Sequence, residues 1–379
     1  MLKILVDENI SFADSAFNQF GNVVLKSGRE VTNKHLKDID VLIVRSITTV
    51  DEDLLKNTPV KFVGTATIGT DHIDLEYLNK RQIYFADAKG CNAYSVAEYI
   101  AAVLLNLAVR YDFRLKDKSI GIVGVGNVGS KVAVFAEALG MKVLLNDPPL
   151  KRSGDKRNFV ELDEILDCDV ITLHTPLNLT GLDKTLHLIN KENLSKINNG
   201  AIIINSSRGA VINNNDLLYE IERKNLKTVL DVWENEPDIN EQLLKNVVIG
   251  TPHIAGYSFE GKVNGTKMIY NSLCRYLHKE PIFNFNLSKP NPFRLNFSNE
   301  GIPEKNLNKL IEEIYSLRRD DDKMKKSVMM SRDERIRFFD LQRKNYPVRR
   351  EFNNYSLASE NLSDEVKSIL SILRFNISS

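Results

Sequence analysis

The segment Gly124-Val125-Gly126-Asn127-Val128-Gly129 most constrains the fold, because it follows an apolar strand at 119–123 and opens a helix at 128–139. In this context the first glycine permits a tight turn and the second lets a pyrophosphate approach the backbone. The third lets helix and strand pack closely. Asp147 follows 18 residues after Gly129, at the end of the next strand, where an acid accepts from ribose hydroxyls and opposes a 2′-phosphate. The segment predicts a Rossmann-type sheet that binds NAD rather than NADP; a flavin, a nucleotide-sugar or an empty turn are the alternatives.

Short apolar runs alternate with helical stretches along most of the chain. Strands are expected at residues 3–6, 41–44, 62–64 and 83–86 in a first sheet, and at 119–123, 143–146, 170–173, 201–205, 228–231 and 247–249 in a second. Helices are expected at 93–109, 128–139, 162–166, 191–196, 214–223 and 259–277. This alternation is typical of parallel sheets with crossover helices, so we expect an α/β fold with a doubly wound sheet.

The length of 379 residues exceeds one typical core and predicts two or three domains. We expect a discontinuous substrate domain at 1–95 plus 257–284, because the helix at 259–277 should pack back on the first sheet. An NAD-binding domain is expected at 96–256 and a C-terminal domain at 285–379. Residues 281–379 hold 18 Lys and Arg against 14 Asp and Glu, whereas the remainder holds 33 against 36, which supports a separate C-terminal domain.

Composition argues against several classes of protein. A net charge of +1 gives no overall attraction to nucleic acid or to a membrane. The apolar run at 99–109 is shorter than the roughly 20 residues that cross a bilayer, and the first apolar stretch is too short for a signal peptide, so we expect a cytoplasmic protein. Cys91, Cys168 and Cys274 match no metal-ligand spacing and are expected to be reduced packing residues, with no metal site.

Three residues at the ends of predicted strands suit the oxidation of a 2-hydroxy acid. Arg208 follows the strand at 201–205, where its planar fork can bind a carboxylate. His253 follows the strand at 247–249 and can remove a hydroxyl proton, while Glu236 can accept from the other ring nitrogen and stabilise the imidazolium. Alone, each would more often be a surface or structural residue, and only their combination indicates catalysis.

Three other histidines are rivals for the base. His72 lies in a turn between Asp71 and Asp74, which favours a structural role. His174 stands at a strand end where it can contact the backbone or the nicotinamide side of a cofactor. His187 is the third rival. Neither His72 nor His174 has an arginine and an acid arranged around it in the same way.

The motifs at 124–129, 206–210, 231–237 and 251–256 resemble those of the D-isomer-specific 2-hydroxyacid dehydrogenase family over roughly residues 1–280. The stretches at 42–46, 62–72, 90–98 and 346–352 are similar to one branch of that family, whose members oxidise 4-phospho-D-erythronate in pyridoxal 5′-phosphate biosynthesis. The resemblance implies a flavodoxin-like substrate (lid) domain that closes over the cofactor domain. It also implies a C-terminal α+β domain that forms a homodimer.

The resemblance further implies roles for individual residues. Those implied to contact substrate are Ser46, Thr67 and Tyr257, and those implied to contact NAD, besides the glycine loop, are Asp147, Thr175, Asp231 and Gly256.

A phosphorylated substrate needs cations at the end opposite Arg208. Arg45 is the candidate in the N-terminal domain, and Arg349 and Arg350 are candidates in the tail. One of the two tail arginines is predicted to cross the dimer and bind the phosphate of the partner's substrate. The alternative is a solvated or acid-paired arginine run.

The expected activity is therefore the NAD-dependent oxidation, at C2, of a small phosphorylated 2-hydroxy acid. Two alternatives stay open. One is another member of the family, acting on phosphoglycerate or glycerate, which would keep the same three residues. The other is a non-enzymatic NAD-sensing protein, like the transcriptional corepressors of the family.

Overall fold

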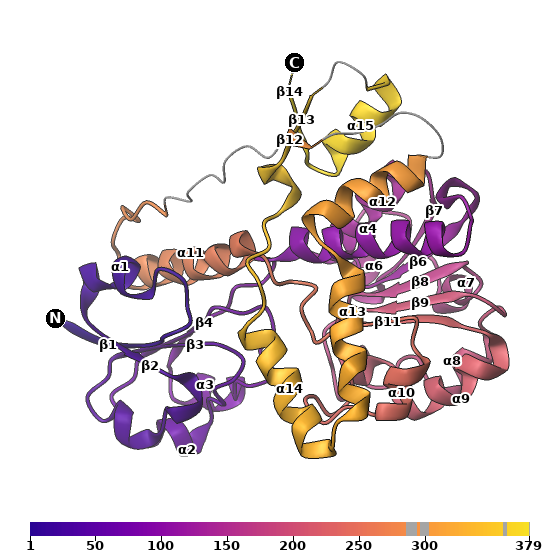
Figure 1. Ribbon diagram of the computed structural model, residues 1–379. Helices are drawn as coiled ribbons and strands as arrows, with labels where there is room; N and C mark the ends of the chain where they lie inside the picture. Colours follow the sequence, from indigo (N-terminus) through magenta and orange to yellow (C-terminus); the bar gives the residue numbers. More distant parts are fainter. Residues whose placement is uncertain (286–293, 296–302, 359–361, 379) are drawn as a thin grey trace. The chain divides into compact units, whose positions relative to one another are not determined.

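The computed structural model describes residues 1–285, 294–295, 303–358 and 362–378. It contains two compact units (Figure 1). The first unit is assembled from Met1–Asn92 and Ser258–Ser288, and the second from Ala93–Tyr257 and Lys289–Ser379. Because each unit has its own sheet, we describe them one at a time.

The first unit is built on a five-stranded parallel sheet with the order β2-β1-β3-β4-β5. Its strands are β1 (Leu2–Asp7), β2 (Gly21–Lys26), β3 (Val41–Val44), β4 (Phe62–Thr65) and β5 (Tyr84–Ala86), with α1 (Ala13–Phe17), α2 (Glu52–Leu55) and α3 (Leu75–Lys80) in the connections. This order is flavodoxin-like. The sequence predicted every strand except β2, an edge strand in which exposed and half-buried residues alternate, so it lacks the continuous apolar run of β3 and β4.

Helix α11 (Phe259–Tyr276) belongs to the first unit although it comes much later in the chain. Its residues Ile269, Tyr270 and Leu273 share a buried cluster with the residues of β1, β3 and β4. A Cβ at Gly265 would lie 2.8 Å from the carbonyl oxygen of Ala66, so this glycine lets the helix approach the loop after β4. The predicted return of the helix at 259–277 to the first sheet is confirmed.

The second unit holds a six-stranded parallel sheet with the order β11-β10-β9-β8-β6-β7. The strands are β6 (Ser119–Val123), β7 (Lys142–Asn146), β8 (Val170–Leu173), β9 (Ile202–Asn205), β10 (Lys227–Leu230) and β11 (Ile249–Gly250). The connections hold α5 (Gly129–Ala138), α6 (Pro148–Arg152), α7 (Leu162–Leu166), α8 (Lys191–Lys196), α9 (Asn214–Lys224) and α10 (Glu241–Asn246). The order reverses between β6 and β8, and in such sheets ligands bind beyond the carboxyl ends of the strands.

The helix that precedes this sheet, α4 (Ala93–Arg110), is a core helix. It is long and apolar enough to cross a membrane, yet 78% of it is buried inside the protein. The prediction of a buried helix is confirmed. Cys91, Cys168 and Cys274 are likewise buried thiols, as predicted.

The C-terminal segment packs on the same core as α4. It contains α12 (Pro303–Ile314), α13 (Leu317–Lys326), α14 (Arg332–Lys344), α15 (Asp364–Ile372) and a parallel sheet of β12 (Arg294–Leu295), β13 (Ser356–Ala358) and β14 (Asn376–Ser378). Figure 1 shows α12 alongside α4, and Leu307, Leu310 and Ile311 join its buried cluster.

Helix α13 covers the edge strand β11. The Asp321 Oδ1 accepts from the Gly250 N–H at 2.8 Å, and the Lys325 Nζ donates to the Val248 carbonyl at 3.0 Å. These bonds satisfy backbone groups that a sheet edge leaves open.

The shared core predicts the effect of one large-to-small substitution. Leu310→Ala is expected to lower the free energy of unfolding of the second unit by about 2–5 kcal/mol, because Leu310 is 1% exposed against α4 and its loss leaves a cavity. The free energy of unfolding is measured by urea titration, with the fluorescence of Trp233, the single tryptophan, reporting on the NAD-binding part. Leu341→Ala, at a 51% exposed position, is the control. An unchanged Trp233 transition in Leu310→Ala would contradict the shared core.

Candidate active site

The glycine loop between β6 and α5 has the geometry of a phosphate cradle. Gly124 has a φ of +84°, and a Cβ there would lie 2.8 Å from the His174 carbonyl oxygen. At Gly129 a Cβ would lie 2.0 Å from the Gly124 carbonyl oxygen, so this glycine is needed for close packing of helix and strand. A Cβ at Gly126 would meet nothing within 4 Å. The backbone at Gly126 therefore faces open space, where a pyrophosphate can approach it.

Two side chains beside this loop also fit a bound dinucleotide. Asp147 accepts from the Val125 N–H at 2.8 Å and the Leu150 N–H at 3.0 Å, one on each oxygen. Each carboxylate oxygen keeps a second lone pair, which ribose hydroxyls can use. The Thr175 Oγ1 is buried and has no hydrogen-bond partner among the described residues. Such an atom fits a ligand site, where the bound ligand supplies the partner.

Arg208 is held by the turn that follows β9. The buried Asn205 side chain accepts from the Ser207 N–H at 3.0 Å and donates to the Arg208 carbonyl at 2.9 Å. A Cβ at Gly209 would lie 1.9 Å from the carbonyl carbon of Trp233, so only glycine lets this turn approach the Trp233–Glu234 backbone. Glu236 lies three residues after Trp233, and this close approach brings the Arg208 and Glu236 loops together.

His253 and Glu236 form the predicted pair. The His253 Nδ1 lies 2.8 Å from the Glu236 Oε2, and the Glu236 Oε1 accepts from the Trp233 N–H at 2.8 Å. Burial by itself would raise the pKa of Glu236, but the charge and hydrogen bond of His253, with a smaller contribution from Arg343, lower it below its ordinary value. The carboxylate is therefore ionised and can hold the imidazole with its Nε2 available to a substrate.

Asp231 fixes the loop that carries His253, a role that the sequence did not indicate. It is 1% exposed, and its carboxylate accepts from the Thr251 hydroxyl at 2.6 Å and from the N–H groups of Ile254 and Ala255 at 2.7 and 2.9 Å. Its carbonyl accepts from the His253 N–H at 2.7 Å, where His253 has a φ of +56°. Contact of Asp231 with NAD stays a prediction, as does that of Gly256.

The rival histidines have other environments. The His72 Nε2 lies 3.0 Å from the Thr65 hydroxyl, in the first unit. Burial lowers the pKa of His174 to about 3, which makes its neutral form a poor base near pH 7. The His187 Nε2 lies 2.6 Å from the Glu234 Oε1, a second histidine–carboxylate pair that the sequence did not predict. Glu234 also accepts from the Asn214 N–H, so this pair ties neighbouring loops together.

The first unit places the predicted substrate residues at the carboxyl edge of its own sheet. Arg45 and Ser46 follow β3, and Thr67 follows β4, where its hydroxyl lies 2.8 Å from that of Thr65. The Arg45 Nε lies 3.1 Å from the Oδ1 of the buried Asp7.

Lys262, in the first turn of α11, was missed by the sequence analysis. Although the residue is exposed, partial desolvation and then the charge of Arg45 lower its pKa, so the two cations lie within electrostatic reach of each other. Gly265 and Thr266, on the same face of α11, contact Ala66 and the Ser11 carbonyl. Lys262 therefore lies on the face of α11 that packs against the loops after β1 and β4.

The tail arginines differ from each other. Arg349 is 6% exposed, donates to the carbonyls of Ser95 and Ala255 at 2.8 and 2.7 Å, and stacks 4.7 Å from the Tyr315 ring. This geometry uses Arg349 within its own chain and gives no support to a contact with a partner's substrate. Arg350 is half-buried and donates to Asn354, and its proposed phosphate contact stays a prediction.

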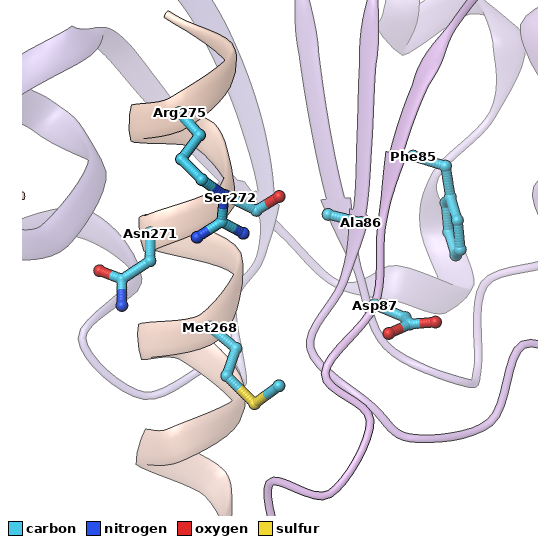
Figure 2. Close-up of a pocket in the computed structure, with 7 residues that line it drawn as sticks. All are labelled: Phe85, Ala86, Asp87, Met268, Asn271, Ser272 and Arg275. Carbon is cyan, nitrogen blue, oxygen red and sulfur yellow. The ribbon is translucent and has the colours of Figure 1, made fainter. Parts of the chain in front are cut away.

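A separate pocket of about 370 Å³ lies in the first unit. Figure 2 shows Met268, Ser272 and Arg275 on the side of α11 that faces Ala86, the last residue of β5, and Asp87, which follows it. Phe85 and Asn271 complete the lining of the pocket. None of the residues predicted to bind substrate or cofactor lines this pocket.

Comparisons with known proteins identify the relatives of this chain. Residues 106–255 match the family model of the D-isomer specific 2-hydroxyacid dehydrogenase, NAD binding domain, and residues 288–371 match a domain of unknown function, DUF3410. The chain is 43% identical over 378 residues to the erythronate-4-phosphate dehydrogenase of Proteus mirabilis, with 99% of each covered. It is 44% identical over 389 residues to that of Psychromonas ingrahamii, covering 99% of this chain and 97% of the relative.

Solved structures of related dehydrogenases share the fold. The NAD⁺-bound 3-phosphoglycerate dehydrogenase of Entamoeba histolytica is 27% identical with a TM-score of 0.62, covering 76% of this chain and 99% of that one. The D-lactate dehydrogenase of Aquifex aeolicus, complexed with NAD and lactic acid, is 25% identical with a TM-score of 0.58, covering 73% and 95%. The predicted fold class and the NAD-binding domain are confirmed. The chain belongs to the D-isomer-specific 2-hydroxyacid dehydrogenases and, among them, to the erythronate-4-phosphate dehydrogenase family.

Proposed function

We propose that this NAD-dependent dehydrogenase oxidises 4-phospho-D-erythronate at C2 to (R)-3-hydroxy-2-oxo-4-phosphooxybutanoate, a step of pyridoxal 5′-phosphate biosynthesis. The names of relatives that match over the full length support this substrate. The observation that carries the chemistry is the Glu236–His253 pair at 2.8 Å, on a loop that packs against the turn of Arg208.

Each residue of the site has one proposed task. Arg208 binds the substrate carboxylate through its planar fork, which aligns the neighbouring carbon. His253 removes the C2 hydroxyl proton through Nε2, and Glu236 stabilises the imidazolium that forms. Bound NAD supplies the acceptor for the C2 hydride. In the reverse direction His253 returns the proton.

Other parts of the chain choose the substrate. In the first unit, Arg45 and Lys262 are proposed to bind the phosphate, and Ser46 and Thr67 to contact the substrate. In the second unit, Tyr257 is proposed to do so. Two cations match the charge of a phosphate better than one. Phosphoglycerate or glycerate is the alternative substrate, and an NAD-sensing role without catalysis is the alternative function.

Turnover separates these alternatives. Purified protein is assayed with phosphoerythronate, phosphoglycerate and glycerate, each with NAD and a 2-oxo acid that reoxidises bound cofactor. We expect the highest kcat/KM with phosphoerythronate. A preference for phosphoglycerate or glycerate would identify another member of the family, and no turnover with any of them would favour the NAD-sensing protein.

We also propose a homodimer in the cytoplasm, formed through residues 285–379. The match of residues 288–371 to a domain model of its own supports a separate role for this segment. Light scattering after size exclusion measures the molar mass of the purified full chain. A mass of about two chains supports the dimer, and a mass of one chain contradicts it.

The pair at the active site predicts the effect of removing the base. His253→Gln is expected to lower kcat by about 10²–10⁴-fold, because proton transfer loses its positioned acceptor. The dissociation constant for NADH, measured by fluorescence titration, should stay close to that of the wild type. His187→Gln is the matched control, and an equal loss of kcat in that variant would contradict the assignment of His253.

Asp147 predicts the choice between the two nicotinamide cofactors. Asp147→Ser is expected to lower the ratio of kcat/KM with NAD to that with NADP by about 10-fold or more, since bonds to a charged group are worth about 1.5–3 kcal/mol. Steady-state kinetics with both cofactors measure the ratio. An unchanged ratio would show that Asp147 only caps α6 and holds the glycine loop.

The cation pair of the first unit predicts a phosphate-specific defect. Lys262→Met is expected to raise KM for phosphoerythronate by about 10-fold or more through the lost charge-assisted bond. Activity with unphosphorylated erythronate, assayed at high concentration, should not fall. Lys267→Met, an exposed lysine on the same helix, serves as the control. Equal losses with both substrates in Lys262→Met would argue against a phosphate contact.

A further inference from the structure

Arg343 lies in the last turn of α14, within the segment that matches a domain of unknown function. Its guanidinium carbon lies 5.9 Å from the centre of the Tyr257 ring. The positive charge of Arg343 interacts with the Tyr257 side chain and with the carboxylate of Glu236. We propose that Arg343 is a positioning residue of the active site, through which the C-terminal segment keeps Glu236 ionised and fixes the Tyr257 phenol. This inference rests on the proposed function of Glu236 and Tyr257.

One face of α14 is fastened to the loop that carries Glu236 and to the first residue of α10. Arg332 pairs with Asp238, and the Arg335 Nη1 donates to the Glu241 Oε2 at 3.1 Å. Phe339 is 1% exposed in the buried cluster that contains Trp233 and Ile239. With Arg343, these side chains follow one another at intervals of three, four and four residues, so they share one face of the helix. The helix therefore delivers Arg343 to the Glu236 loop in a fixed orientation.

Tyr257 is held from a second side by the same segment. The rings of Tyr257 and Tyr346 meet edge to face at 5.8 Å and 84°. The Tyr346 hydroxyl donates to the Asp320 Oδ2 on α13 at 2.6 Å. Two side chains of the C-terminal segment, Arg343 and Tyr346, thus contact a residue that is proposed to bind substrate.

Arg343 is a half-buried guanidinium whose charge is favoured by the groups around it. Burial opposes its charge, but Tyr257, Glu236 and, more weakly, Asp340 outweigh this and raise its pKa. Its Nε is buried without a hydrogen-bond partner among the residues the structure describes. Glu236 in turn is influenced by His253, by Arg343 and by the Trp233 N–H. A fixed cation thus offsets the cost of burying the Glu236 carboxylate, and its loss would move protons toward the Glu236–His253 pair.

The pH dependence of kcat/KM tests this role. Arg343→Met is expected to move the acidic limb of the profile upward by about 0.5–1 pH unit, because a nearby positive charge no longer opposes protonation. On the acidic side of the limb, kcat/KM at a fixed pH should therefore fall by about 3–10-fold. Arg343→Lys keeps the charge and should restore the limb. Arg337→Met, an exposed arginine on the same helix, should behave as the wild type.

A double-variant cycle tests the contact with Tyr257. If Arg343 acts in part through the phenol, the losses in Tyr257→Phe and Arg343→Met should be less than additive in the combined variant. Full additivity would remove Tyr257 from the proposal. An unchanged acidic limb and unchanged kcat/KM in a folded Arg343→Met enzyme would overturn it altogether.

A readout without substrate separates this inference from the proposed function. In protein with ¹³C-labelled histidine, the resonance of His253, assigned from His253→Gln, is titrated with pH. Arg343→Met should move its midpoint upward even if phosphoerythronate proves not to be the substrate. An unmoved midpoint in an enzyme that does turn over phosphoerythronate would refute the role of Arg343 and leave the function intact.

Discussion

The second unit depends on the buried carboxylate of Asp231, which accepts three hydrogen bonds from the loop that follows β11. A charged group without water is costly unless its bonds are satisfied, and here a hydroxyl and two backbone N–H groups satisfy it. The Thr251 hydroxyl also lies 2.9 Å from that of Tyr99, which extends the network into the core helix α4. The loop is thereby fixed in the conformation that aims His253 at Glu236.

Close backbone approach is the second requirement of the site. Gly209 brings the Arg208 turn against Trp233, and Gly129 brings α5 against the turn at Gly124. Any side chain at either position would collide with backbone atoms, which cannot move aside as a flexible side chain can. Glycine therefore sets how near the cofactor loop and the catalytic loops come to their neighbours.

The C-terminal segment serves both packing and chemistry. It completes the core of α4 through Leu307, Leu310 and Ile311, and it satisfies the edge strand β11 through Asp321. The same segment holds Arg349 in a buried position, where the carboxylates of Glu98 and Glu351 contribute to its environment. Two arginines of this segment therefore have different roles. Arg349 is buried and bonded within the core, whereas Arg343 is proposed to act on Glu236.

The sequence by itself determined the strands that are buried on both faces of their sheets and the glycine loop. It also determined that Arg208, Glu236 and His253 follow β9, β10 and β11. These features depend on local patterns, namely continuous apolar runs, glycine spacing and polar residues at strand ends. It did not predict β2, whose burial alternates at a sheet edge, or the positions of β12 to β14. Only the tertiary structure decided that Asp231 holds the His253 loop, that Arg349 is buried, and that Lys262 and Arg343 join Arg45 and Glu236. Such contacts join residues far apart in the chain, and whether a charged side chain meets solvent or a partner depends on packing that no local pattern records.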